Sequence, residues 1–321
     1  MAEGTTGQSG AAEAAPRRGP LAALIVELRP RQWTKNLIVF AALIFSANID
    51  DSDRFLRSLA AFAIFCGLSG ASYLINDLTD LERDRLHPKK CLRPLAAGEV
   101  GKGAALATAV AVATAALAGS FFLGWAFFAT AVGFFALLLA YSFVLKELVI
   151  IDAMTIAAGF VLRVVAGALA IDVPISPWII LCTALLALFL ALVKRRYELV
   201  TVEDPLAHRP TLEHYSEDFL DAMIATITAA TIVAYSLYTF FTHDGVGTAT
   251  GDGASAATVA HDPWMMVTIP FVAYGMFRYL YLVHLKGLGG SPEEILVSDV
   301  PLIVDIVLFV VVALAVLGLQ G

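Results

Sequence analysis

Charge is scarce in this chain: only 15% of its 321 residues are charged. Soluble globular domains carry about a quarter, so the composition excludes an ordinary soluble domain. Cysteine is also rare, and Cys66, Cys91 and Cys182 are widely spaced and odd in number, which indicates no disulfide framework. The chain does not open with a short apolar segment and a small-residue cleavage site, so we expect no secretory signal peptide.

Apolar residues are abundant instead, at 59% of the chain, and the mean hydropathy is +0.79. Apolar runs of about 18 or more residues recur, which is typical of membrane-spanning helices. The pattern predicts an all-α polytopic membrane protein with nine spans, at residues 24–47, 55–75, 104–124, 126–145, 149–171, 177–194, 219–241, 264–285 and 300–319. The first span is the least regular, because "ELRPRQWTKN" places charges and a proline within it.

Lysine and arginine gather in the loops on one side of the predicted membrane. With the N-terminus in the cytoplasm, every Lys and Arg except Arg54, Arg57 and Arg163 falls on the cytoplasmic side. Cytoplasmic loops carry such an excess of positive charge, so we expect a cytoplasmic N-terminus and, with nine spans, a C-terminus outside. Residues 1–19 are small, polar and Pro/Gly-containing, which predicts a disordered tail before a single membrane domain at residues 20–321.

The stretch "NDLTDLERD", residues 76–84, gathers carboxylates where the second predicted span ends. If the helix continues through it, Asn76, Asp77, Asp80 and Asp84 share an arc about 100° wide, because successive residues turn by about 100°. Mg²⁺ typically binds a few carboxylates together with phosphate oxygens of a substrate. The stretch therefore predicts a metal site for a diphosphate; the alternative is a solvated helix end with ordinary interfacial charges.

Several stretches resemble known proteins. The pattern N-D-x-x-D-x-x-x-D and the following "RPLAAGEV" resemble the first acidic motif of the UbiA superfamily of intramembrane prenyltransferases. Four further stretches narrow the resemblance to its decaprenyl-phosphate phosphoribosyltransferase branch, over about residues 25–320: "LRPRQWTKN", "YSFVLKELVIIDAMTIAAGFVLRVVAGA", "SPWIILCTALLALFLALVKRRYEL" and "RYLYLVHLKGLGGSPEEILVSDVPL".

The resemblance implies a nine-helix bundle in a bacterial plasma membrane, with a central cavity that opens to the cytoplasm. The implied reaction moves 5-phosphoribose from 5-phosphoribosyl 1-diphosphate to decaprenyl (polyprenyl) phosphate, releases diphosphate and feeds arabinan synthesis for the cell wall. The implied cofactor is Mg²⁺, or Mn²⁺ in its place; Asp77, Asp80 and Asp84 are then the catalytic carboxylates, and Asn76 completes the metal ligands. We expect the chain to be surrounded by membrane lipid and to have no nucleic-acid partner. Whether it forms a homo-oligomer is left open at this point.

One motif of the superfamily is missing. Ordinary members carry a second acidic motif, D-x-x-x-D, after the sixth span, where this chain reads "KRRYELVTVEDPLAHRPTLEHYSEDFLD". The nearest approximation is Glu217 with Asp221. Lys194 and Arg195 instead predict contacts to phosphate monoesters, and Glu198, four residues after Lys194, predicts a side chain that orients it. The alternative is the basic end of a cytoplasmic helix.

Other basic and aromatic residues are candidate substrate contacts. The resemblance makes Lys35 a phosphate contact, although it also fits an interfacial lysine. Lys89 and Arg93 follow the carboxylate stretch and can close over a diphosphate; as the alternative, they contribute to the inner-leaflet charge. Tyr141 and Lys146, at the end of the fourth span, resemble a corner motif of the superfamily.

Arg163 is the one arginine placed deep in a predicted span. It follows Asp152 by 11 residues, which corresponds to about 16 Å along a helix. Ionisable residues inside a membrane usually face a cavity or a partner, so we expect Arg163 to contribute to the substrate site, or to pair with Asp305 of the last span.

Two other functions stay open at this point. A conventional UbiA-type prenyltransferase, with a polyprenyl diphosphate donor and an aromatic acceptor, would share the first acidic motif, but the missing second motif disfavours it. A transporter would place coupling charges near the membrane midplane and show repeated halves. Only Arg163 is deep in this chain, and we find no such repeat.

Overall fold

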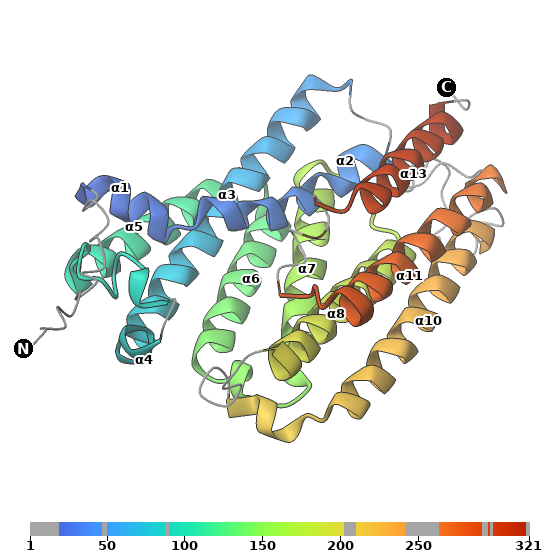
Figure 1. The fold of residues 1–321 in the computed structure, drawn as a ribbon. Coiled ribbons are helices and arrows are strands. Elements are labelled where there is room, and N and C mark those ends of the chain that lie inside the picture. The colour runs from blue at the N-terminus through green and yellow to red at the C-terminus, as the bar shows by residue number, and fades with distance from the viewer. Residues whose placement is uncertain are drawn as a thin grey trace, which may run out of the picture.

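The computed structural model describes residues 19–46, 50–87, 90–201, 210–241, 263–290, 295 and 298–318. These residues form helices and their connections, with no β-strand among them. Figure 1 shows the long helices side by side in one bundle. The tail predicted to be disordered lies outside the described residues except for Gly19.

Seven helices in the described chain are long and apolar enough to cross a membrane. They are α3 (Ser52–Thr79), α5 (Lys102–Phe121), α6 (Trp125–Phe143), α7 (Ile151–Ala170), α8 (Pro177–Thr201), α10 (Glu217–Phe241) and α11 (Ile269–Lys286), the last preceded by η5 (Pro263–Thr268). A shorter apolar helix, α13 (Val300–Gly318), follows them. The prediction of an all-α, multi-pass membrane protein is confirmed. The described residues contain seven helices of spanning length rather than the nine predicted spans.

The first predicted span, residues 24–47, is not one continuous helix. The segment divides into α1 (Pro20–Glu27), η1 (Pro30–Phe40) and α2 (Ala41–Phe45). Arg29, between α1 and η1, has a φ of 53°, which a non-glycine residue rarely adopts, and Pro30 after it has no backbone N–H to donate. In Figure 1 the segment runs across the bundle, from α3 to α7.

Two glycines let this segment approach the long helices closely. A Cβ atom at Gly70 of α3 would lie 2.9 Å from the side chain of Leu28, and one at Gly167 of α7 would overlap the carbonyl group of Val39. Since only glycine lacks that atom, the backbone of the first segment can lie directly against both helices. The segment is therefore part of the bundle wall.

The long helices pack as two connected halves. In the half formed by α3, α5, α6 and α7, Phe65 packs against Phe127 and Phe134, with ring centroids 6.0 and 4.6 Å apart. In the half formed by α8, α10 and α11, Phe189 meets the ring of Tyr279 edge-on at 5.5 Å. Helices α7 and α8 contact each other and join the halves.

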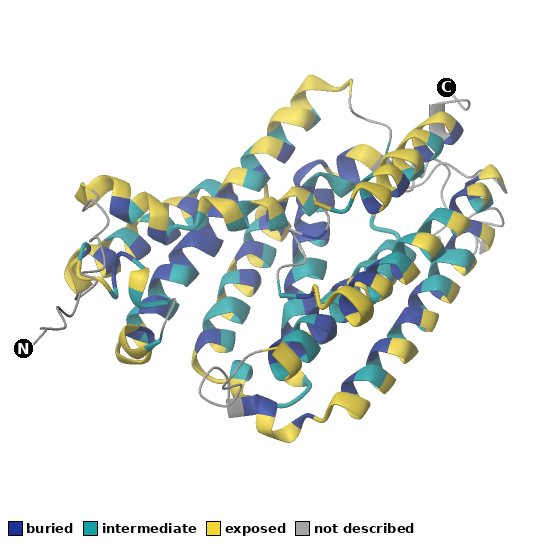
Figure 2. Ribbon diagram, in the orientation of Figure 1, coloured by how far each residue is buried: buried dark blue, intermediate teal, exposed yellow. Residues whose placement is uncertain are grey.

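The outer faces of the helices are apolar and exposed. Figure 2 shows exposed positions on the outer sides of α5, α10, α11 and α13, and buried ones toward the interior. The exposed side chains include Leu106 and Val110 of α5, Phe277 of α11, and Val307 and Val311 of α13. Large exposed apolar surfaces mark contacts with a membrane or a partner, and here they cover helices of spanning length.

The turns gather at two ends of the bundle. At one end, Arg57 of α3 bonds to the carbonyl oxygen of Ala170 and pairs with Asp172 at 3.1 Å, so the start of α3 lies beside the end of α7. At the opposite end, α3 finishes in the carboxylate stretch, and α7 begins close to it. Ion pairs gather at this second end, which we call the carboxylate end.

Candidate active site

The helix of the second span does not continue unbroken through the carboxylates, which corrects the prediction. Helix α3 ends at Thr79, Asp80 leaves the helical conformation with φ −93° and ψ 6°, and α4 (Leu81–Leu86) begins after it. The Thr79 hydroxyl donates to the carbonyl oxygen of Asn76 at 2.8 Å. Side chains that bond to the local backbone in this way compete with the helix. Asp80 lies at this break and has a different basic partner from Asp77 and Asp84.

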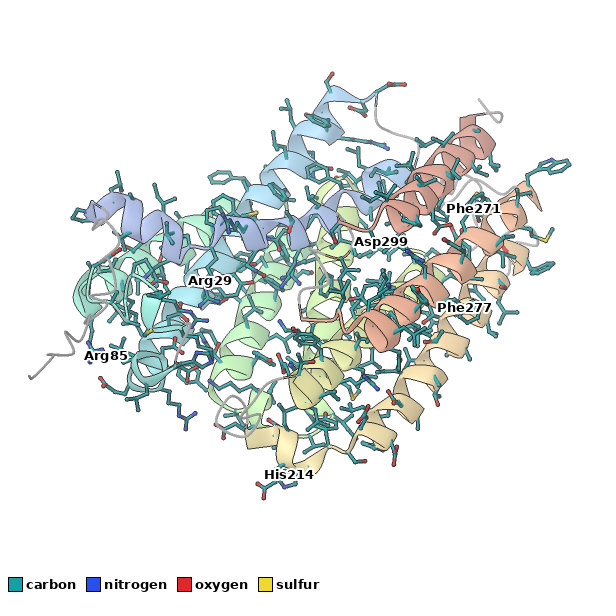
Figure 3. All side chains as sticks on the ribbon, in the orientation of Figure 1. Arg29, Arg85, His214, Phe271, Phe277 and Asp299 are labelled. Carbon is teal, nitrogen blue, oxygen red and sulfur yellow. The ribbon has the colours of Figure 1, made fainter. Side chains whose placement is uncertain are left out.

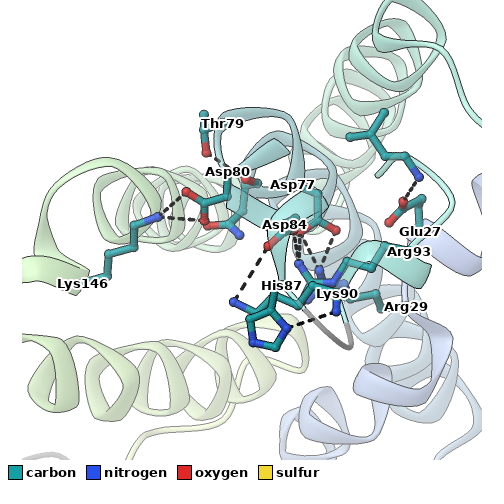
Figure 4. A network of polar contacts seen from close by, with 12 residues as sticks. Glu27, Arg29, Asp77, Thr79, Asp80, Asp84, His87, Lys90, Arg93 and Lys146 are labelled. Carbon is teal, nitrogen blue, oxygen red and sulfur yellow. Dashed lines mark hydrogen bonds and ion pairs between the residues drawn. The ribbon is translucent and has the colours of Figure 1, made fainter. Parts of the chain in front are cut away.

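Asp77 and Asp84 are buried and share one guanidinium group (Figure 4). Arg93 Nη1 lies 2.9 Å from Asp77 Oδ1 and also bonds to Asp84 Oδ2. Arg29 also donates to Asp77, at 2.6 Å to Oδ1. Figure 3 shows Arg29 beside α3, whereas Arg85 on α4 points away from the bundle, where it pairs with Glu82. Two arginines, together with Lys90 at 3.8 Å from Asp84 Oδ1, thus neutralise the two buried carboxylates.

Asp80 has a different partner. Lys146 Nζ lies 3.0 and 2.9 Å from its two carboxylate oxygens. Lys146 belongs to η3 (Leu145–Glu147), the connection from α6 to α7, so this ion pair joins two parts of the bundle that are distant in sequence. Lys146 of the predicted corner motif therefore lies against the carboxylate stretch.

The residues present fit a hard divalent cation by their chemistry. Asn76, Asp77, Asp80 and Asp84 offer oxygen atoms, the ligands that Mg²⁺ prefers. No group of three or more His, Cys, Asp or Glu side chains within the described ranges is arranged to hold a metal ion. Instead, Arg93 and Lys146 supply positive charge where the carboxylates converge. Each carboxylate of the stretch therefore has a basic partner, with Arg93 beside Asp77 and Asp84 and Lys146 beside Asp80.

Glu27 is a buried carboxyl group that the sequence did not single out. It is 1% exposed at the end of α1 and accepts a hydrogen bond from the backbone N–H of Leu95 at 2.6 Å. Burial, together with the neighbouring Asp77 carboxylate, raises the pKa of its carboxyl group to about 7, and the hydrogen bond from the Leu95 N–H opposes this shift. Glu27 thus connects α1 to the loop that carries Arg93. In the sequence, the only local sign that Glu27 and Arg29 belong to the site is that these two charged residues stand just before Pro30 in an apolar segment.

The basic stretch of α8 divides between two environments. Arg195 is buried, with Nε 2.7 Å from Asp152 Oδ2 and Nη1 2.6 Å from Glu198 Oε2. It also donates to the hydroxyl group of Tyr141 at 3.5 Å. Arg195 is thus enclosed by carboxylates rather than exposed to a substrate, which differs from its predicted role. Lys194 is half-buried, and Glu198, predicted to orient it, is paired with Arg195.

Tyr215 extends this network to the connection between α6 and α7. Its hydroxyl group donates to Asp152 Oδ1 at 3.0 Å and accepts from the backbone N–H of Ile150 at 2.6 Å. Asp152 and Tyr215 were missed as site residues because they lie 63 residues apart, so no local spacing connects them.

The two carboxylates nearest to a second acidic motif are already paired. Arg196 donates to Glu217 Oε1 at 2.6 Å and bonds to Asp221 through two of its nitrogens. His284 Nε2 of α11 lies 3.2 Å from Asp221 Oδ1. These groups tie α8, α10 and α11 together at the carboxylate end.

The remaining predicted residues lie at different depths. Lys35 is half-buried in η1, and Lys89 lies outside the described residues. Arg163 is buried in α7, where its Nε donates to Asn36 Oδ1 at 2.7 Å. The predicted pairing of Arg163 with Asp305 is wrong, because Asp305 of α13 lies against Gly275 of α11.

Comparisons with known proteins show the family to which the chain belongs. The model of the UbiA prenyltransferase family matches residues 36–288, which include the carboxylate stretch and the basic stretch of α8. The chain belongs to the UbiA prenyltransferase family. It is similar to decaprenyl-phosphate phosphoribosyltransferase of Mycolicibacterium smegmatis, with 36% identity over 89% of this chain and 91% of that one. The protein of the same name from Corynebacterium glutamicum is 34% identical over 86% of this chain and 81% of that one.

Solved structures of UbiA proteins share the fold. A UbiA homologue from Archaeoglobus fulgidus bound to GPP and Mg²⁺ has a TM-score of 0.67 at 19% identity, covering 92% of this chain and 99% of that one. The same homologue bound to Cd²⁺ gives a TM-score of 0.66 at 18% identity, with the same coverage. These likenesses confirm the UbiA-like helical bundle, while the central cavity and its opening stay predictions.

Proposed function

We propose that this UbiA-family chain is a phosphoribosyltransferase that acts on a lipid phosphate. It transfers 5-phosphoribose from 5-phosphoribosyl 1-diphosphate to decaprenyl phosphate, or to a polyprenyl phosphate of another length, and releases diphosphate. The product is decaprenylphosphoryl 5-phosphoribose, a precursor for cell-wall arabinan. The names of relatives that match nearly the whole chain support this reaction.

The observation that carries the proposal is that the carboxylates nearest to a second acidic motif are already paired with an arginine. Glu217 and Asp221, the nearest approximation to it, are both held by Arg196. A prenyltransferase that grips a prenyl diphosphate through two acidic motifs needs such carboxylates for a second cation. With one carboxylate stretch and Lys194 on α8, the chain is better suited to a donor with a single diphosphate and an additional phosphate monoester.

The carboxylate stretch would hold one divalent cation, which we propose to be Mg²⁺, with Mn²⁺ as a substitute. Asn76, Asp80 and Asp84 would be its ligands, and Asp77 would lie alongside. A bound cation supplies charge neutralisation for the diphosphate leaving group. Arg93, which lies between Asp77 and Asp84, is then available for the diphosphate oxygens, as is Lys146 next to Asp80.

The transfer itself needs no general base. A phosphate monoester is already an anion at neutral pH, so an oxygen of the lipid phosphate attacks C1 of the ribose directly. The new C1–O bond forms as the bond from C1 to the diphosphate oxygen breaks, and the anomeric centre inverts. The chain contributes alignment of the two substrates and positive charge near the leaving group.

Other predicted residues take supporting roles in this proposal. Lys35, Lys89, Lys194 and Tyr141 contact the phosphate groups or the ribose. Arg195 and Glu198 act indirectly, because their ion pair holds Tyr141 in place. The chain lies in a bacterial plasma membrane with this end in the cytoplasm, where the water-soluble donor is available.

Donor choice tests the proposal against a conventional prenyltransferase. Purified protein with Mg²⁺ is given either 5-phosphoribosyl 1-diphosphate and decaprenyl phosphate, or a polyprenyl diphosphate and an aromatic acid. Mass spectrometry of the lipid extract should detect phosphoribosylated lipid in the first mixture and no prenylated acid in the second. A prenylated aromatic product without phosphoribosyl lipid would establish the conventional prenyltransferase instead.

A further inference from the structure

The described chain contains two buried arginines, and only one of them has a counter-ion. Arg195, 1% exposed, lies between the carboxylates of Asp152 and Glu198. Arg163, 6% exposed, makes one hydrogen bond, from Nε to the neutral amide oxygen of Asn36. No carboxylate in the described part of the chain pairs with Arg163. A buried positive charge without a partner is costly in a membrane and marks a functional site.

The surroundings of Arg163 do not neutralise it. Its guanidinium group lies over the rings of Phe134 and Phe160, 4.7 and 5.1 Å from their centroids, and this attraction offsets only part of the lost hydration. The Asn36 Oδ1 also accepts a hydrogen bond from Ser69 Oγ at 3.5 Å, and its Nδ2 donates to Cys66 Sγ at 3.3 Å. Among the described residues, the one hydrogen bond of Arg163 comes from Nε and none comes from its two terminal nitrogens.

The position of Arg163 relates it to the carboxylate stretch. Ser69, Tyr73 and Asp77 follow one another at four-residue intervals, so they share one face of α3. Ser69, which bonds to the partner of Arg163, lies about 12 Å along α3 from Asp77. The guanidinium group of Arg163 extends toward the N-terminal end of α7, because a Cβ atom at Gly159 would lie 3.5 Å from Arg163 Nη1. Arg163 thus extends toward the carboxylate end from deeper in the bundle.

We propose that Arg163 binds the phosphate group of the lipid acceptor, an inference that rests on the proposed function. A phosphate monoester supplies the missing negative charge and several acceptors for the guanidinium fork. The aromatic rings and the depth of the site suit a phosphate carried on an apolar chain. The ribose 5-phosphate of the donor carries the same chemical group, but it reaches the chain from water and meets the half-exposed basic groups first. A lipid phosphate at Arg163 faces the ribose from the side opposite the diphosphate.

Direct binding tests this proposal without catalysis. Binding of farnesyl phosphate and of farnesol to purified protein is measured in nanodiscs, with 5-phosphoribosyl 1-diphosphate as a third ligand. Arg163→Gln should weaken farnesyl phosphate binding roughly 10- to 150-fold, the effect of losing a charge-assisted hydrogen bond, and leave binding of farnesol and of the sugar diphosphate within about twofold of wild type. Arg57→Gln, which removes an arginine at the opposite end, should change none of the three. Unchanged farnesyl phosphate binding in Arg163→Gln would overturn the proposal.

Asn36→Asp provides a second test in which the arginine is kept. The new carboxylate has the size of the amide and pairs with Arg163, so it competes with a phosphate. We expect weaker farnesyl phosphate binding, by at least about tenfold, with thermal stability equal to or above that of wild type. If Arg163 has only a structural role, this variant is stabilised while lipid phosphate binding is unchanged, and the proposal fails.

These experiments distinguish a failure of the proposed function from a failure of the inference about Arg163. If the wild type binds farnesyl phosphate through Arg163 but forms no phosphoribosyl lipid, the inference holds and the proposed function is wrong. If phosphoribosyl lipid is formed and the Arg163 and Asn36 variants keep the wild-type KM for the acceptor, the proposed function holds and the inference is wrong. A rise in the donor KM with no change for the acceptor would assign Arg163 to the donor 5-phosphate, which also contradicts the proposal.

Discussion

Lys194 and Arg195 are neighbours in the sequence, yet they have different surroundings. Arg195 is buried between Asp152 and Glu198, so its removal breaks two buried ion pairs. Breaking a buried ion pair in this way costs about 3–5 kcal/mol. Arg195→Ala should therefore lower the thermal unfolding temperature in detergent markedly, with loss of activity that follows loss of folded protein.

Two neighbouring substitutions act as controls for this prediction. Arg196→Ala removes ion pairs to the more exposed Glu217 and Asp221, so the loss of stability should be about 1 kcal/mol or less. Lys194→Ala should leave stability nearly unchanged and weaken phosphate binding roughly 10- to 150-fold. A variant Arg195→Ala that unfolds at the wild-type temperature but has lost phosphate affinity would restore the role predicted from the sequence.

The connection between α6 and α7 is the element that carries Lys146 to Asp80. Thr211, in η4 (Pro210–His214), donates to the carbonyl oxygen of Lys146 at 2.9 Å, and Tyr215 accepts from the N–H of Ile150. Ile150 has a φ of 68°, so the turn needs outside support to keep this conformation. Residues 210–215 therefore act as a brace that positions Lys146.

Tyr215→Phe tests the brace, because it removes one hydroxyl group and keeps the ring. We expect kcat/KM for transfer to fall about tenfold or more, since small displacements of positioned groups are costly, with little loss of stability. Tyr235→Phe is the matched control: it removes a hydroxyl group that bonds to Thr268 at 2.6 Å, between α10 and η5. Equal effects of the two substitutions, or full activity of Tyr215→Phe, would rule out a positioning role.

The long helices could be predicted from the sequence because hydropathy alone determines them. Helices α5 and α7, for example, begin and end within three residues of the predicted spans 104–124 and 149–171. The breaks at Arg29 and Asp80 could not, since they depend on contacts with other elements: Gly70 and Gly167 admit the broken first segment, and Lys146 holds Asp80. The carboxylates of the site were evident as a local motif, whereas their partners come from distant positions.

At the scale of the whole molecule, the bias of Lys and Arg predicts the orientation in the membrane. Asp53, at the start of α3, and Glu82, on α4, are both exposed acidic residues at opposite ends of the bundle. With the native cysteines replaced by serine, Asp53→Cys should react with an impermeant thiol reagent added to intact cells, and Glu82→Cys only after the cells are opened. The reverse pattern would place the carboxylate end outside and remove the donor from its reach.

Transfer of labelled ribose tests the central claim most directly, because it asks whether the carboxylate end carries out phosphoribosyl transfer. Purified protein is incubated with ribose-labelled 5-phosphoribosyl 1-diphosphate, and label is counted in the organic phase. We predict that label enters lipid only with polyprenyl phosphate and Mg²⁺ or Mn²⁺ present, and that EDTA abolishes the transfer. Asp80→Asn and Asp84→Asn should each lower the rate about 100-fold or more, as when one electrostatic stabiliser is removed, while the protein stays folded. Full transfer in EDTA, or in the variant that carries both substitutions, would contradict the account.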